Sequence, residues 1–391
     1  MTIRENMKSD ATVTGIEHRA LTGNSAYIIF IILMIVTALV LPINVLASHE
    51  GGEGYCEGCH VLHQSDGGAD TSMLIGSDPS STCLRCHAES GQYYNVLSND
   101  GSSYTPGGDF YWLTKTFTWN ENSMVSSSEG DSHGHNIVAL DYGLMGDSML
   151  TFAPGDLYPS SAMGCESCHD PHGITDGDSA DESVSASDNF RLLGGIGYNG
   201  GSQDYGITFN YPAPVAVADP DDWTETDTNH TAYGSGMSEW CSNCHSEFLN
   251  SGNKHPAGNN ATLTSTIIAN YNSYLKTGNF FGTQANAYTA LIPFELGTSD
   301  RSLLNPSSMS GPGASGNPNV MCLTCHRAHA SAFEAIGRWD FPETFIANSH
   351  PRAGDGGASG NDIINSYYGR DMTAQFGLYQ RQLCNKCHVQ D

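Results

Sequence analysis

Twelve cysteines carry the clearest chemical signal in this 391-residue chain, because all of them fall in six copies of the motif Cys-x-x-Cys-His. Numbered one to six along the chain, the copies are Cys56, Cys59 and His60; Cys83, Cys86 and His87; Cys165, Cys168 and His169; Cys241, Cys244 and His245; Cys322, Cys325 and His326; and Cys384, Cys387 and His388. In such a motif both thiols attach a haem covalently and the histidine ligates the haem iron. Since no cysteine is left over for a disulfide or a nucleophile, the sequence predicts six covalently bound haem c groups.

Two other uses of paired cysteines compete with haem attachment. Cys-x-x-Cys pairs build zinc ribbons, and they also oxidise reversibly as redox dithiols. Neither use requires a histidine directly after the second cysteine, whereas this chain has one in every copy. Haem attachment is therefore the favoured interpretation.

The remaining histidines offer the second ligand that a haem iron needs unless it binds substrate. Nine histidines lie outside the motifs and beyond residue 47: His49, His63, His133, His135, His172, His230, His255, His329 and His350. They outnumber the irons, so we expect every iron to be closed and the protein to transfer electrons rather than to act as an enzyme. The less favoured alternative, a multihaem reductase of small oxyanions, requires an open iron.

Three of these histidines, His63, His172 and His329, follow a motif histidine by three residues. The motif histidine occupies one face of its own haem, and a side chain three residues later cannot reach the opposite face of the same ring. We therefore expect each of the three to ligate a neighbouring haem. This arrangement predicts haems at very short range, as electron transfer between them requires.

Residues 1–47 have the features of a secretory signal peptide. An almost wholly apolar run at residues 26–41 follows a leader with basic side chains, and small residues lead up to Ala47. We expect cleavage near Ala47, with an uncleaved membrane anchor as the alternative, since a spanning helix needs about 20 apolar residues. Residues 48–391 then form a single elongated hexahaem cytochrome domain that is secreted to the outer cell surface or the medium.

The fold class predicted is mostly irregular coil with short α-helices and little β structure. With so few residues for each haem, the chain is expected to wrap the porphyrins, which are themselves large apolar bodies, rather than to pack a conventional core. Gly, Ser, Asn, Asp and Pro are spread throughout and favour turns. Short helices are expected at residues 262–276, 284–291, 331–337 and 373–379 and as one turn at several motifs, and surface loops at residues 176–188 and 305–319.

The formal net charge of −27 makes nucleic acid a poor partner, because phosphate binding needs basic patches. A strongly acidic surface instead favours solubility and cationic or oxidised-metal partners.

Several long irregular strings of this sequence resemble those of the outer-surface hexahaem c-type cytochromes of metal-reducing bacteria, which polymerise into conducting extracellular filaments. The strings lie at residues 106–110, 115–120, 134–139, 165–173, 233–245, 255–258, 282–285, 322–331 and 367–388. The resemblance implies that this chain carries electrons along closely stacked haems, as one protomer of a filament. A discrete electron shuttle that does not polymerise is the alternative.

The resemblance also selects six distal ligands, one for each iron. They are His49, His63, His135, His172, His255 and His329, whereas His133, His230 and His350 match no family position. It further implies a head-to-tail homopolymer in which His63 ligates a haem of the next protomer. Other multihaem cytochromes are then the expected electron donors, and a metal oxide, an electrode or another cell is the expected acceptor.

Overall fold

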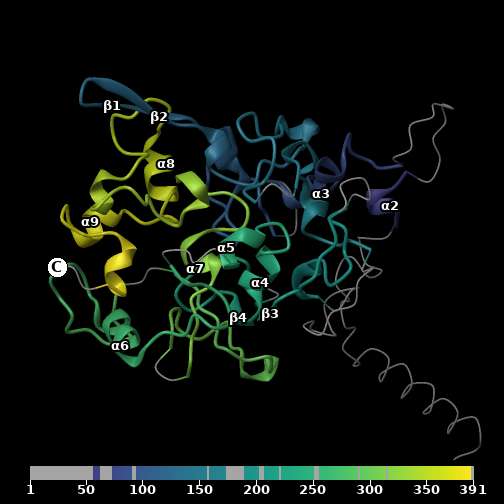
Figure 1. The fold of residues 1–391 in the computed structure, drawn as a ribbon. Helices are drawn as coiled ribbons and strands as arrows, with labels where there is room; N and C mark the ends of the chain where they lie inside the picture. The colour runs from purple at the N-terminus through teal and green to yellow at the C-terminus, as the bar shows by residue number, and fades with distance from the viewer. Residues whose placement is uncertain are drawn as a thin grey trace, which may run out of the picture. The chain divides into compact units, whose positions relative to one another are not determined.

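The computed structural model describes residues 56–61, 73–89, 94–155, 158–172, 189–201, 207–219, 222–250, 255–288, 291–313 and 316–388. The predicted signal peptide, His49, His63 and the predicted loop at residues 176–188 lie outside these ranges. Over the described residues most of the backbone is irregular, and regular structure is limited to short helices and two small sheets (Figure 1). The predicted fold class is confirmed.

The helices of the described residues are short, and none is longer than nine residues. The α-helices are α2 (Cys56–Cys59), α3 (Pro79–His87), α4 (Met237–Cys241), α5 (Ser246–Asn250), α6 (Ser265–Ser273), α7 (Cys322–Cys325), α8 (Gly360–Asn365) and α9 (Met372–Phe376). The 3-10 helices are η1 (Phe110–Thr114), η2 (Gly130–Ser132), η3 (Leu140–Tyr142), η4 (Ser160–Ala162), η5 (Cys165–Ser167), η6 (Phe190–Leu192), η8 (Arg301–Leu303), η9 (Glu334–Ile336), η10 (Ile346–Asn348) and η11 (Leu383–Lys386).

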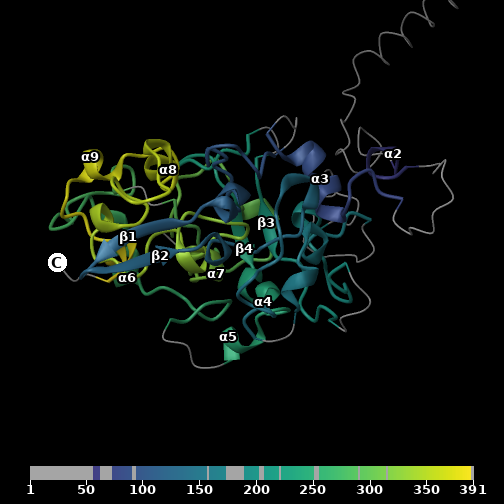
Figure 2. The ribbon, with the colours of Figure 1, turned by 90° about the horizontal axis from the view of Figure 1, so that it is seen from above.

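Two antiparallel pairs make up the β structure. Strands β1 (Phe117–Glu121) and β2 (Met124–Ser128) form a hairpin that is seen along its length in Figure 2. Its two turn residues, Asn122 and Ser123, have φ angles of 49° and 66°. Positive φ at both positions is the type I′ geometry, which matches the twist of paired strands.

The second pair leads directly into a haem motif. Strand β3 (Val215–Val217) pairs with β4 (Ala232–Ser235), and a β-bulge interrupts β3. Helix α4 begins two residues after β4 ends, beyond Gly236, whose φ of 90° turns the chain. Helix α4 then lies beside α7, so that motifs four and five are neighbours, as both views show (Figures 1 and 2).

Buried apolar side chains of the described residues form four separate clusters instead of one continuous core. Motif cysteines pack against all four: Cys325 and Cys387 against one, and Cys165, Cys241 and Cys244 against one each. The apolar side chains therefore gather around the positions at which haems would be attached, in agreement with the expectation that the chain wraps its cofactors.

The four expected helices were predicted with mixed success. Helix α6 lies inside residues 262–276, and α9 overlaps residues 373–379. Residues 331–337 hold only the 3-10 turn η9, and the helix expected at residues 284–291 is wrong, because no helix forms over the described part of that segment. The described part of residues 305–319 is free of helix and strand, as expected of a loop. No helix of the described ranges is long and apolar enough to cross a membrane.

Candidate haem-binding site

The motifs fold into helical turns, and motif two forms the end of the longer helix α3. In motifs three to six the histidine amide donates a hydrogen bond to the carbonyl of the first cysteine, at 2.9 to 3.0 Å. One turn of helix brings side chains three and four residues apart onto the same face. The two thiols and the histidine of a motif therefore point to one side, as attachment of one haem requires.

Capping groups fix where two of these turns begin. Helix α3 starts with Pro79, and the Asp78 carboxylate accepts a hydrogen bond from the Ser81 amide at 2.7 Å. At the start of α4, the Met237 amide donates to the buried Glu295 carboxylate at 2.6 Å. Asp78 is the N-cap of α3, whereas Glu295 reaches α4 from a distant segment, and each satisfies an amide that has no partner inside the helix.

Four of the six motif histidines face a histidine from outside the motifs. The ring centres are 6.0 Å apart for His60 and His172, 6.0 Å for His245 and His135, 6.4 Å for His169 and His329, and 6.0 Å for His388 and His255. Each pair joins one motif histidine to one of the predicted distal ligands. The two remaining distal candidates, His49 and His63, lie outside the described residues.

The spacing of these pairs fits two imidazoles that bind one metal ion from opposite sides. With a metal–nitrogen bond of about 2 Å on each side, the two ring centres lie about 6 Å apart. Two imidazoles are also a known axial ligand set of c-type haem iron. The donor sets present in the structure therefore fit the haems that the motifs attach.

Hydrogen bonds to backbone carbonyls orient several of these imidazoles. Nδ1 lies 2.7 to 3.3 Å from a carbonyl oxygen in His87 (Tyr94), His169 (Arg191), His245 (Pro154), His326 (Ala335) and His135 (Ala328). An imidazole that donates its Nδ1–H to a carbonyl keeps the lone pair of Nε2 for a metal. The backbone thus selects the tautomer that a haem iron needs.

Burial keeps these imidazoles neutral. It lowers the pKa of His135 to about 4 and the pKa of His329 to about 3. It also holds the pKa values of His245 and His326 below the usual value. A neutral imidazole is the form that ligates a metal, so these residues are ready to bind at physiological pH.

His329 is held in place on two sides. Its ring stacks on Phe110, with centres 4.9 Å apart and planes 24° apart. On another side it passes so close to Gly107 that a Cβ there would lie 2.7 Å from Nδ1. A glycine at position 107 is therefore needed for this imidazole to face His169.

The three histidines without a family counterpart are engaged in other contacts. Buried His133 lies 2.8 Å from the Ser128 hydroxyl through Nε2 and 3.0 Å from the Trp112 carbonyl through Nδ1. Each ring nitrogen of His230 lies 3.0 Å from a backbone carbonyl. His350 contacts a carboxylate at 2.7 Å through Nδ1 and stacks on Trp119 with ring centres 3.7 Å apart. These side chains have structural partners, which the sequence could not reveal.

A repeated contact joins consecutive motifs, and the sequence analysis missed it. The Cys165 amide of motif three donates to the Ser80 hydroxyl at 3.1 Å, and the Cys322 amide of motif five donates to the Ser238 hydroxyl at 3.0 Å. Both serines lie three residues before the first cysteine of the preceding motif, and both are buried. A serine three residues before the first cysteine, present in motifs two and four, is the feature of the sequence that could have indicated this contact.

The same two pairs of motifs bring their first cysteines together. The Cys83 thiol contacts the Cys165 thiol, and the Cys241 thiol contacts the Cys322 thiol. Motifs two and three, and motifs four and five, therefore present neighbouring points of haem attachment. Haems attached at these thiols would be neighbours.

Helical Cys-x-x-Cys-His turns whose histidines face second histidines across the width of a metal site define a c-type cytochrome, a protein that binds its haem covalently. Comparison with known proteins agrees with this class. No protein-family model matches the chain. The chain is 39% identical to the c-type cytochrome OmcS of Geobacter sulfurreducens over an alignment of 411 positions, which covers 88% of this chain and 94% of that relative. This chain belongs to the OmcS family of c-type cytochromes.

Solved structures lead to the same family. The outer membrane cytochrome S filament from Geobacter sulfurreducens is 38% identical, with a TM-score of 0.74, over 88% of this chain and all of that one. A cryo-electron microscopy structure of the OmcS nanowires from the same organism is 37% identical, with a TM-score of 0.71, over 86% of this chain and 98% of that one. The resemblance noted in the sequence is thereby confirmed.

Proposed function

We propose that this chain is the protomer of an extracellular filament that conducts electrons along six haem c groups, each held between two histidines. The observation that carries the proposal is the set of four histidine pairs with ring centres 6.0 to 6.4 Å apart. An iron with a histidine on both faces has no vacant position for a substrate, and it suits electron transfer. The filament structures of the relatives support the assembly.

The pairs at odd-numbered motifs follow a series. His60 of motif one faces His172, which follows motif three, and His169 of motif three faces His329, which follows motif five. Each odd motif thus takes its second histidine from a position three residues beyond the histidine of the motif two further along. Motif five has no motif two places further along its own chain. The series would continue at motif one of another copy of the chain.

His63 is the residue that fills this position. It lies three residues after His60, as His172 lies after His169. We therefore assign His63 of one protomer to the haem of His326 in the next. A contact of this kind is head-to-tail and does not close on itself, so repetition produces an open filament.

The pairs at even-numbered motifs form a series in the other direction. His245 of motif four faces His135, from the segment after motif two, and His388 of motif six faces His255, from the segment after motif four. Each even motif takes its second histidine from two motifs earlier. By the same rule motif two takes His49, which precedes motif one, so that all twelve proposed ligands are used once.

When bound, the haems supply reversible one-electron exchange at their irons. The chain itself performs the positioning. The cysteines would hold each haem, backbone carbonyls orient the imidazoles, and the contacts of Ser80 and Ser238 hold consecutive attachment points together. We place the mature chain, cleaved near Ala47, at the outer cell surface, with other multihaem cytochromes as donors and a mineral, an electrode or another cell as acceptor.

Substitution of His63 tests the assembly. The secreted His63→Ala chain is expected to retain all its haems but to remain as separate protomers in negative-stain electron microscopy. The His230→Ala chain is the matched control and should form filaments, because His230 has only backbone partners. Normal filaments from His63→Ala would contradict the assignment of His63. Separate particles from the unaltered chain under all conditions would instead support a discrete shuttle.

A further inference from the structure

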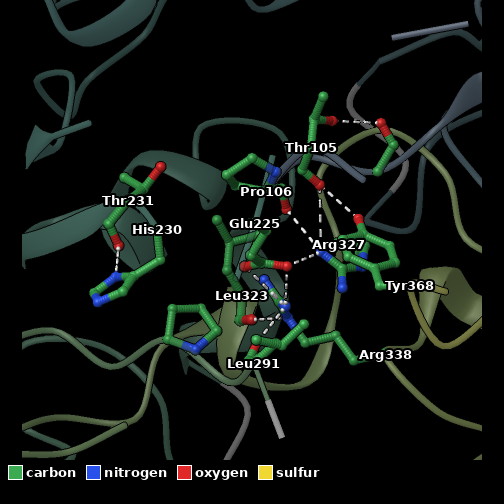
Figure 3. A network of polar contacts seen from close by, with 12 residues as sticks. Thr105, Pro106, Glu225, His230, Thr231, Leu291, Leu323, Arg327, Arg338 and Tyr368 are labelled. Carbon is green, nitrogen blue, oxygen red and sulfur yellow. Dashed lines mark hydrogen bonds and ion pairs between the residues drawn. The ribbon is translucent and has the colours of Figure 1, made fainter. Parts of the chain in front are cut away.

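Two guanidinium groups share one carboxylate inside the protein (Figure 3). Arg327 Nη1 lies 2.7 Å from Glu225 Oε2, and Arg338 Nη1 lies 3.5 Å from the same oxygen. The side chains of all three are buried, with exposed fractions of 7% for Arg327, 2% for Arg338 and 3% for Glu225. We call these residues the Arg–Glu–Arg cluster.

The cluster is bonded to the turn that carries motif five. Arg338 Nε donates to the carbonyls of Leu323, at 2.6 Å, and His326, at 3.2 Å. Arg327 directly follows His326, and its Nη1 donates to the Pro106 carbonyl at 3.2 Å. Arg338 thus contacts the backbone of the motif, partly through the carbonyl of the motif histidine itself, and Arg327 is the next residue after that histidine.

The charges of the cluster do not cancel. Two arginines and one glutamate leave one net positive charge, since burial lowers the pKa of Arg338 but a guanidinium stays protonated at any physiological pH. Tyr368, whose ring lies 3.6 Å from the Arg327 guanidinium, adds no charge because burial raises its pKa. Arg370, a half-buried residue, is a further cation that interacts with Arg327.

Stability alone is a poor explanation for such a cluster. The desolvation of buried ion pairs commonly offsets their attraction, and an apolar replacement is often as stable. The chain also has only 15 basic residues against 42 acidic ones, yet it encloses two of them here. A buried charge acts over a longer range than an exposed one, because salt and water screen it less.

We propose that the Arg–Glu–Arg cluster is a fixed positive charge that raises the reduction potential of the haem attached at Cys322 and Cys325. A ferric haem carries one more positive charge than a ferrous haem, so a nearby uncompensated cation favours the ferrous state. The cluster thereby makes the haem of motif five easier to reduce, within a protein that is otherwise strongly acidic. This inference rests on the proposed occupancy of the motifs by haem.

Two substitutions that change the charge of the cluster in opposite directions test the inference. Glu225→Gln raises the net charge by one with almost no change in side-chain volume, and Arg338→Gln lowers it by one with a shorter polar side chain. The haem-loaded chain is titrated potentiometrically and followed by visible absorbance. In Glu225→Gln, the part of the absorbance change that belongs to one haem should occur at a higher potential. In Arg338→Gln the same part of the absorbance change should occur at a lower potential.

Two further variants separate charge from geometry. Arg338→Lys keeps the charge but alters the hydrogen bonds to Leu323 and His326, and its titration should stay close to that of the unaltered chain. Arg352→Gln removes a cation whose side chain is 43% exposed, and it should cause no shift. Shifts in the same direction for Glu225→Gln and Arg338→Gln, or an equal shift for Arg338→Lys, would overturn the inference.

Haem content and ferric spin state, measured on the same samples, separate this inference from the proposed function. An unaltered chain without low-spin haems contradicts the proposed function itself. Low-spin haems with no shift in either variant contradict only the role of the cluster. If Arg338→Gln fails to mature, Glu225→Gln decides alone, because an upward shift supports the inference and any other result overturns it.

Discussion

His60 and His172 face each other with ring centres 6.0 Å apart and planes inclined by 20°, although one belongs to motif one and the other follows motif three. Contacts of this kind join distant segments of a chain whose described residues form only small apolar clusters. A metal between the two rings would link these segments directly. Ligand bonds would then supply the long-range connections that side-chain packing supplies in most proteins.

The pairing of His60 with His172 predicts the result of removing one partner. In His172→Ala the haem at Cys56 and Cys59 should remain attached, because thioether formation does not need His172, but its iron should lose the second ligand. The electron paramagnetic resonance spectrum of the oxidised protein should then show a new high-spin ferric signal from one haem. His230→Ala is the control and should stay entirely low-spin. An entirely low-spin spectrum of His172→Ala would show that the pair does not share an iron.

The angle between facing imidazoles predicts two kinds of low-spin signal. His255 and His388 are nearly perpendicular, at 89°, whereas His60 and His172 are nearly parallel, at 20°. Perpendicular axial imidazoles leave two iron orbitals close in energy, so they produce a more anisotropic ferric signal than parallel ones. His255→Ala should remove a strongly anisotropic signal, and His172→Ala should remove a less anisotropic one. Loss of the same feature in both variants would contradict the two geometries.

The contact of Gly107 with His329 predicts that a single methyl group disturbs a ligand. In Gly107→Ala the new Cβ would lie 2.7 Å from Nδ1 of His329, so the imidazole must leave its present position opposite His169. We expect a loss of stability of about 1 to 3 kcal/mol, because overpacking destabilises a protein by this amount. We also expect a partial loss of one low-spin signal. Chemical denaturation and paramagnetic resonance measure the two effects.

Gly146→Ala is the matched control for the substitution at Gly107. Its nearest neighbours would lie 3.4 Å or more from the new Cβ, which is ordinary contact. Its stability should change by no more than about 0.5 kcal/mol, with an unaltered spectrum. Equal effects of the two substitutions would show that Gly107 has no special relation to His329.

The buried Glu295 predicts a dependence of stability on pH. Burial raises the pKa of this carboxyl from 4.5 to about 7, so the folded state keeps its proton between these values while the unfolded chain has lost it. The free energy of unfolding should therefore fall as pH rises from 4.5 to 7, by up to about 3 kcal/mol. Glu295→Gln should lack this fall, because glutamine does not ionise and can still accept a hydrogen bond from the Met237 amide.

Denaturant titrations at pH 5 and pH 8 measure the effect of Glu295. The stability of Glu295→Gln relative to the unaltered chain should increase between the two pH values. Glu334→Gln, at an exposed glutamate, is the control and should follow the unaltered chain. A constant difference between Glu295→Gln and the unaltered chain would mean that Glu295 does not titrate in this range.

Local features were predictable from the sequence, because the chemistry of the motif fixes them. Cysteines three residues apart with a histidine next to the second require one helical turn, and the described motifs have it. The helix expected at residues 284–291 failed for a tertiary reason. The Tyr288 amide donates to the Tyr274 carbonyl at 2.7 Å, and the buried Tyr288 ring packs against Phe376. The apolar residues of this segment instead make contacts with distant segments of the same chain.

The pairing of histidines was beyond the sequence, because it depends on which distant segments meet. His133 and His135 are two residues apart, yet His133 contacts Ser128 and Trp112 while His135 faces His245. The family resemblance selected His135, but it did not name its partner. Spacing explained why a histidine three residues after a motif should serve another haem, and only the structure showed that His172 faces His60 and His329 faces His169.

A side-chain-resolution cryo-electron microscopy map of the secreted protein tests the central claim most directly. The account predicts six haems, each between two histidines, with His172, His329, His135 and His255 opposite His60, His169, His245 and His388. It also predicts that His63 of one protomer lies opposite His326 of the next. An open iron at any motif, or one of the four described pairs divided between two irons, would contradict it.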